Sequence, residues 1–233
     1  MTLHLRPATP DDVPAAADVL ADAFTDYPWT TWAVDAGGHG ERLRALHRLY
    51  LSAVAVPYGH VDLGGTGEEL VGVAVWVPAT GVPDEVWARV GPAAAELAGD
   101  RTTAAEEADA VLAERRLDEP HVALAGLGVA RHQQGRGLGR ATLVPGLARA
   151  DQDRLPVHLE TSAEPNVRFY ARLGFTVTAV VDLPGGGPRT WLMRRVPRPA
   201  APRPARPRPT PREPGPSQDD SRRAVLCRDH DRA

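Results

Sequence analysis

A glycine-rich stretch, LGVARHQQGRGLGRATL, occupies residues 127–143. Its glycines stand at alternate positions, Gly135, Gly137 and Gly139. Glycine lets the backbone approach a ligand closely, and successive N–H groups at the start of a helix bind phosphate oxygens without cationic side chains. Arg136 and Arg140 can add charge-assisted hydrogen bonds. The stretch therefore predicts a phosphate-binding turn between a strand and a helix.

Three phosphate-binding patterns compete for this stretch. A Walker A loop needs a lysine after its last glycine, and the chain contains no lysine. The dinucleotide pattern G-x-G-x-x-G fails, because its last position falls on Arg140 or on Thr142. The third pattern, Q/R-x-x-G-x-G/A, is met by Gln134, Gly137 and Gly139.

A second informative stretch, HLETSAEPNVRFYARLGF, occupies residues 158–175. It predicts a strand followed by a short helix. Asn166 and Tyr170 are four residues apart, so they lie on one face of that helix. His158 and Glu160 share one side of the strand.

Both stretches resemble the GNAT N-acetyltransferases, in which Q/R-x-x-G-x-G/A is followed by N-x-x-F/Y-Y-x-x-x-G-F. The resemblance implies an enzyme that transfers an acetyl group from acetyl-CoA to a primary amine. It implies that Tyr170 acts as general acid toward the departing thiolate, and that Asn166 bonds the pantetheine arm. The implied cofactor-binding residues are Leu127, Gly128, Val129, Gln134, Gly135, Arg136, Gly137, Leu138, Gly139, Arg140, Asn166 and Tyr170.

A basic amine must lose its proton before it attacks a thioester, so the site needs a base or a water chain. Glu160 is the candidate base, and an ion-paired strand carboxylate is the equal alternative. His158 and His121 are weaker candidates, because a lone strand histidine is more often only hydrogen-bonded. The single cysteine is Cys227, near the C-terminus, so direct transfer is expected rather than an acetyl-enzyme.

Further segments resemble the branch of the family that acetylates aminonucleoside antibiotics such as puromycin. They include FTDYP, VDAGGHGERLRALHRLYL, GPAAAELAG and GPRTWLMRR. The resemblance implies a small-molecule amine acceptor and a role in antibiotic resistance or detoxification. Asp26, Tyr27 and Trp32 are predicted to line the acceptor pocket. Trp29 and Trp32 are replacements relative to that branch and can reshape the pocket for another amine. The alternative hypothesis is a catalytically weak acyl-CoA-binding regulatory module with a partner-docking tail.

The elements that must position these residues alternate between strand and helix patterns. Short apolar stretches predict strands near residues 3–6, 60–63, 70–77, 120–130, 157–161, 175–181 and 189–195. Helical spacing predicts one helix after Thr9 and others near residues 41–55, 84–97, 103–115, 137–152 and 165–173. The fold class is α/β (α+β). The resemblance implies a mixed, mostly antiparallel twisted sheet of six or seven strands, with acetyl-CoA in the splay between the fourth and fifth.

Composition limits the partners. The formal net charge is −3 and 42% of the 233 residues are hydrophobic, which does not favour nucleic-acid binding. No apolar run approaches the roughly 20 residues that span a bilayer, so we expect a cytoplasmic protein without a membrane partner. No metal is expected, and monomer and homodimer both remain open. Residues 2–197 are predicted to form one N-acetyltransferase domain, and residues 198–233 a disordered Pro/Arg-rich tail.

Overall fold

A computed structural model describes residues 3–198 of the chain. Apart from Arg198, the predicted C-terminal tail lies outside the described residues, and so does Cys227.

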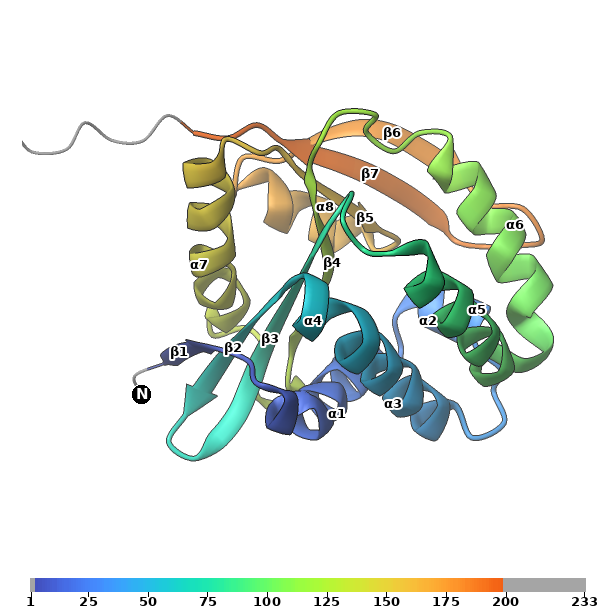
Figure 1. Ribbon diagram of the computed structural model, residues 1–233, viewed down its shortest axis with the longest axis horizontal. Coiled ribbons are helices and arrows are strands. Elements are labelled where there is room, and N and C mark those ends of the chain that lie inside the picture. Colours follow the sequence, from blue (N-terminus) through green and yellow to red (C-terminus); the bar gives the residue numbers. More distant parts are fainter. Residues whose placement is uncertain (1–2, 199–233) are drawn as a thin grey trace, which may run out of the picture. The chain divides into compact units, whose positions relative to one another are not determined.

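Seven strands form one sheet in the order β1-β2-β3-β4-β5-β7-β6 (Figure 1). Their bounds are β1 (His4–Pro7), β2 (His60–Thr66), β3 (Glu69–Pro78), β4 (Val122–Val129), β5 (Val157–Thr161), β6 (Thr176–Asp182) and β7 (Arg189–Arg195). All neighbouring strands pair antiparallel except β4 and β5, which are parallel. The predicted mixed, mostly antiparallel sheet is confirmed.

The pairing of β4 with β5 ends soon after it begins. Only Val122 pairs with Val157 and Ala123 with His158, and the strands then part. The register between β3 and β4 shifts at Ala125, which is an extra residue in β4. Such a bulge bends its strand away from a regular ladder. Ala125 is exposed although it lies in a central strand, as expected where the sheet opens into a splay.

The helices cover both faces of this sheet. The longer ones are α1 (Val13–Phe24), α3 (His39–Tyr50), α5 (Asp84–Ala98), α6 (Thr102–Ala113) and α7 (Leu138–Asp153), and α8 spans Glu164–Ala171. Alternate residues of β3 explain the two layers, because successive side chains of a strand point to opposite faces. Val73 and Val75 pack with α1, whereas Ala74 and Trp76 pack with α7.

Two segments differ from the sequence prediction. Helix α2 (Pro28–Ala33) was not predicted, because six residues are too few to show a helical period. Pro28 occupies its first turn, where a missing N–H costs nothing. The predicted helix 41–55 ends as an α-helix at Tyr50 and continues as a π-helical segment, Leu51–Ala55, before α4 (Val56–Tyr58). Short 3-10 turns at Pro10–Asp12, Gly99–Arg101 and Arg131–Gln133 complete the elements.

A buried polar cluster fixes α7 against the sheet. Asp62 is 3% exposed and accepts hydrogen bonds from Trp76 Nε1 at 2.9 Å and from Arg149 Nη2 at 2.6 Å. The Trp76 ring lies directly against the helix, because a Cβ atom at Gly146 would stand 2.1 Å from it. Only glycine fits at this contact. The cluster holds the helix that begins at the glycine-rich turn.

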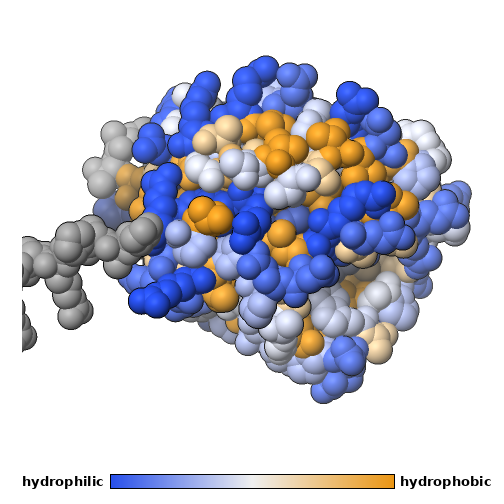
Figure 2. Space-filling view, turned by 90° about the horizontal axis from the view of Figure 1, so that it is seen from above, coloured by the Kyte–Doolittle hydropathy of each residue, from blue (hydrophilic) through white to orange (hydrophobic). Residues whose placement is uncertain are grey.

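Strand β6 forms the outer edge of the sheet beyond β7. Val177 and Val180 on this strand are 42% and 52% exposed. Figure 2 views the molecule from the side on which β6 lies and shows apolar residues among hydrophilic ones. None of the helices in the described part of the chain is long and apolar enough to cross a membrane.

Candidate active site

The glycine-rich turn has the backbone conformation that its sequence predicts. Gly135 and Gly137 have φ angles of 77° and 78°, in the left-handed region that favours glycine. Gly137 is the N-cap of α7, and a Cβ atom at Gly135 or Gly137 would meet nothing within 4 Å. The turn is therefore open on its outer side. Its N–H groups lie at the positive end of a sixteen-residue helix, where phosphate oxygens are stabilised.

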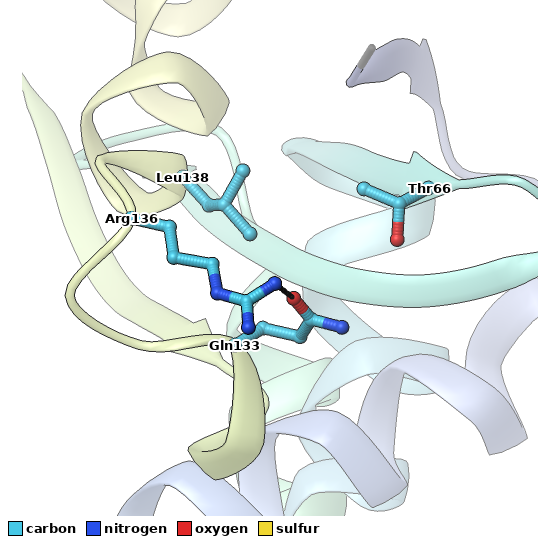
Figure 3. A pocket seen from close by; sticks show the side chains of 4 residues that line it. All are labelled: Thr66, Gln133, Arg136 and Leu138. Atoms are coloured by element: carbon cyan, nitrogen blue, oxygen red, sulfur yellow. Dashed lines mark hydrogen bonds between the residues drawn. The ribbon is translucent and has the colours of Figure 1, made fainter. Parts of the chain in front are cut away.

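Side chains of the turn support its shape. Gln134 Nε2 donates to the carbonyl oxygen of Val129 at 3.0 Å, which ties the turn to the end of β4. Arg136 Nη1 donates to Oε1 of the buried Gln133 at 3.0 Å. Figure 3 shows these two side chains facing a cavity of about 250 Å³ that Thr66 and Leu138 also line. Arg136 thus has a protein partner beside the predicted phosphate site.

The end of β4 has one free edge beside the splay. Leu127, Gly128 and Val129 pair with β3 on their other edge. No described strand pairs with these residues on the side of β5. Their backbone groups on this edge can therefore bond an extended ligand as an added strand would. The glycine turn at the end of this edge is suited to a pyrophosphate, so the residues present fit acetyl-CoA.

Tyr170 lies near the end of α8 and is 8% exposed. Its ring packs edge-on against Phe169 and Phe175, at centroid distances of 5.0 and 5.6 Å. Burial raises the pKa of Tyr170 well above its usual range, and the nearby Tyr27 adds to this. The phenol therefore keeps its proton at neutral pH and is able to donate it.

Thr161 joins three elements of the site. Its Oγ1 accepts a hydrogen bond from Asn166 Nδ2 at 3.2 Å and lies 3.1 Å from the Tyr27 hydroxyl. The Tyr27 hydroxyl also accepts the backbone N–H of Ser162 at 2.6 Å. The predicted residues Asn166, Tyr27 and Tyr170 are therefore brought together around the end of β5.

Glu160 is held by charged neighbours. Arg116 Nε donates to Glu160 Oε1 at 2.8 Å, and His158 Nε2 lies 3.4 Å from the same oxygen. Arg116 also pairs with Asp109 on α6 at 2.5 Å. Burial raises the pKa of Glu160, but the hydrogen bonds with His158 and Arg116 outweigh it and leave the pKa below its usual value. Glu160 is thus a carboxylate with a weak affinity for a proton.

The other two predicted acceptor residues have protein partners. Asp26 pairs with Arg131 at the start of the 3-10 turn that precedes the glycines. Trp32 Nε1 donates to the carbonyl oxygen of Gly185 at 3.2 Å, and the Arg101 guanidinium lies 5.2 Å from the Trp32 ring centre. Asp26 therefore braces the 3-10 turn before the glycines, and Trp32 ties α2 to the loop between β6 and β7.

Sequence reasoning missed Arg116, Arg131 and Thr161. Arg116 follows the end of α6 in a run of charged residues, and its partner Glu160 is 44 residues away. The spacing of residues along the sequence does not indicate a pair that is so far apart in the chain. Thr161 lies on the other side of β5 from His158 and Glu160, and its contact with Tyr27, 134 positions away, has no sequence signal. Among residues 3–198 no group of three or more His, Cys, Asp or Glu residues is arranged to hold a metal ion.

Comparison with known proteins agrees with this geometry. Residues 65–175 match the acetyltransferase (GNAT) family model. A crystal structure from Corynebacterium glutamicum, described as histone acetyltransferase HPA2 and related acetyltransferase, is 26% identical, with a TM-score of 0.67 over 85% of this chain and 98% of that one. The fold also resembles a polyamine N-acetyltransferase from Drosophila melanogaster, at 16% identity and a TM-score of 0.60 over 84% of this chain and 100% of that one. Arylalkylamine N-acetyltransferase 2 from Aedes aegypti gives 12% identity and a TM-score of 0.57 over 84% and 99% of the two chains.

The parallel splay beside the glycine turn, together with the family match over residues 65–175, makes the protein an acetyl-CoA-dependent acyltransferase. It is a GNAT N-acetyltransferase.

Proposed function

We propose that this N-acetyltransferase acetylates the primary amine of a small molecule by direct transfer, and that an aminonucleoside such as puromycin is an acceptor. The observation that carries the proposal of direct transfer is the buried Tyr170. Its side chain is 8% exposed, and because burial raises its pKa the hydroxyl keeps its proton at neutral pH. A buried phenol that keeps its proton suits a departing thiolate.

The co-substrate supplies an activated acetyl group as a thioester. The turn from Gln134 to Arg140 binds its pyrophosphate through backbone N–H groups, and the free edge of Leu127, Gly128 and Val129 orients the pantetheine arm. Asn166, held by Thr161, bonds the same arm. Tyr170 donates the proton of its hydroxyl to the departing sulfur. The proton that the amine gives up passes to a base on β5, where Glu160 and its neighbour His158 are the candidates.

Aromatic rings pack around Tyr27, one of the predicted acceptor residues. Phe24 packs against Tyr27 at 5.2 Å and against His47 at 5.6 Å, measured between ring centres. Burial lowers the pKa of His47 to about 4, so its ring is neutral at pH 7 and does not repel a cationic amine. The resemblance of FTDYP and neighbouring segments to puromycin-acetylating enzymes favours an aminonucleoside.

The test is a thiol-release assay with acetyl-CoA and purified protein. Puromycin is compared with other aminonucleosides, aminoglycosides, polyamines and amino acids. Rapid release with puromycin supports both the acceptor class and its named member. Release only with another class of amine retains the N-acetyltransferase and rejects the aminonucleoside. Acetyl-CoA binding without release for any amine supports the regulatory module instead.

A further inference from the structure

His158 is buried at the point where β4 and β5 part. It is 3% exposed and is the last residue of β5 that pairs with β4. Its Nε2 lies 3.4 Å from Glu160 Oε1, whereas its buried Nδ1 has no hydrogen-bond partner among residues 3–198. An unpaired buried polar atom costs roughly 1–3 kcal/mol, so the unpaired nitrogen calls for a physical reason.

The partner of Nε2 determines where the ring carries its proton. Burial raises the pKa of Glu160, but its hydrogen bonds with His158 and Arg116 lower the pKa by more than burial raises it. The net pKa is below its usual value, so Glu160 is ionised at neutral pH. A carboxylate only accepts hydrogen bonds. The proton of a neutral His158 ring therefore resides on Nε2, and Nδ1 presents a lone pair.

Charged groups surround the ring on several elements. Arg116 and Asp109 extend the pair beyond Glu160. The His121 ring stands edge-on to the His158 ring, with 5.6 Å between ring centres. Arg194 of β7 is the cross-strand partner of His158 and pairs with Glu119. Among these groups, Glu160 is the carboxylate that faces Nε2 of His158.

We propose that Nδ1 of His158 is the base that takes the proton of the acceptor amine, and that Glu160 acts on it as a positioning residue. This inference rests on the proposed function. A carboxylate that fixes the tautomer of a catalytic imidazole is a recurrent arrangement in nucleophilic catalysis. In this site the imidazole of His158 activates the acceptor amine rather than a nucleophilic side chain.

The proton and bond changes balance. The amine nitrogen forms a bond to the acetyl carbon, and its proton passes to His158 Nδ1. The bond between the acetyl carbon and sulfur breaks, and the sulfur receives the proton of the Tyr170 hydroxyl. His158 then releases one proton to water and Tyr170 regains one. The net change is one amide and one thiol from one amine and one thioester.

The tautomer can be measured without any acceptor. Protein labelled with ¹⁵N-histidine gives separate imidazole signals for protonated and unprotonated ring nitrogens, and His158→Gln assigns the signal of His158. The proposal predicts a neutral ring with its proton on Nε2, and a partial shift toward the Nδ1–H form in Glu160→Gln. A wild-type ring with its proton on Nδ1 overturns the proposal. A tautomer that is indifferent to Glu160→Gln overturns the role of Glu160.

Kinetics supply the second arm. The amide of His158→Gln can still donate to Glu160 but cannot take a proton. We expect kcat/KM for the acceptor to fall by about 10²-fold and the Kd of acetyl-CoA to stay unchanged. The matched control is His60→Gln, because His60 is exposed at the start of β2. We expect its kinetics to equal those of the wild type. Unimpaired turnover in His158→Gln overturns the proposal. If the wild type acetylates no amine, the proposed function fails, while the tautomer measurement still tests the geometry of this base.

Discussion

The hydroxyl of Tyr27 accepts the backbone N–H of Ser162 at 2.6 Å, although the two residues are 135 positions apart. The same hydroxyl lies 3.1 Å from Thr161 Oγ1. Tyr27 stands between α1 and α2, whereas Ser162 follows the strand that carries His158 and Glu160. This contact therefore joins the helices predicted to shape the acceptor pocket to the strand predicted to do the chemistry.

Removing the Tyr27 hydroxyl tests that connection. Tyr27→Phe leaves the Ser162 N–H without its acceptor, so we expect the free energy of unfolding to fall by about 1–3 kcal/mol. Urea unfolding measures the change. Tyr58→Phe, on the short helix α4, is the control and should change the stability by less than about 0.5 kcal/mol. Equal stability of the two variants would show that the Tyr27 hydrogen bond contributes nothing.

Tyr170→Phe removes the proposed proton donor while keeping the packed ring. We expect kcat to fall by about 10²-fold and the Kd of acetyl-CoA to stay within about twofold. Because the pKa of Tyr170 is raised, the wild-type donor should remain protonated throughout neutral and mildly alkaline pH. A pH profile of kcat therefore shows no loss from this group until the pH exceeds the usual tyrosine value of about 10. Unchanged turnover in Tyr170→Phe would remove the residue from its assigned role.

The glycine turn should tolerate no side chain at Gly137. Gly137→Ala forces a non-glycine residue to a φ of 78°, which costs about 1–2 kcal/mol. A shift of the turn misaligns its N–H groups, so we expect the Kd of acetyl-CoA, measured by calorimetry, to rise at least about tenfold. Gly67→Ala is the matched control, because Gly67 has a φ of 65° and equally open surroundings but lies in the β2–β3 turn. Similar losses of affinity in both variants would argue against a cofactor role for the turn.

A second pair links the end of β7 to α7 and makes stability depend on pH. Arg195 is 3% exposed and donates to both carboxylate oxygens of Asp151, at 2.7 and 2.8 Å. These hydrogen bonds hold the pKa of Asp151 below its usual value. The stabilisation is therefore complete above the unfolded pKa of about 3.9 and is lost as the pH falls through the folded pKa.

Asp151→Asn removes this charge while keeping the shape of the side chain. At neutral pH we expect a loss of about 2 kcal/mol of unfolding free energy, because the amide accepts only one of the two hydrogen bonds and leaves the buried Arg195 guanidinium without its counter-charge. The difference from the wild type should shrink as the pH is lowered below about 4. Urea unfolding at several pH values measures both. A difference that stays constant with pH would contradict the assigned ion pair.

The sequence predicted the strands and the glycine turn well because both have local signatures. A strand was predicted near each of the seven in the sheet, and Gly135 and Gly137 adopt the backbone that their residue type favours. Helix α2 gave no such signal, since Pro28 starts a helix of only six residues. The extra residue at Ala125, which helps to open the splay, also leaves no pattern in a run of small residues.

Predictions for the acceptor side were weaker for a physical reason. Asp26 and Trp32 were assigned to the pocket by their type and their place in the chain, yet their partners Arg131 and Gly185 come from distant segments. The pairing of Arg116 with Glu160 likewise depends on how α6 packs near β5. A single sequence shows which residues carry chemistry but not which distant charges neutralise them.

The most direct test of the account is product analysis of wild-type protein incubated with acetyl-CoA and puromycin, with the amine panel in parallel. Mass spectrometry measures the acetylated amine, and a thiol reagent measures free CoA in the same sample. The account predicts N-acetyl product and CoA in equal amounts, with puromycin or another aminonucleoside as an acceptor. CoA release without an acetylated amine, or no product with any amine while acetyl-CoA binds, would contradict it.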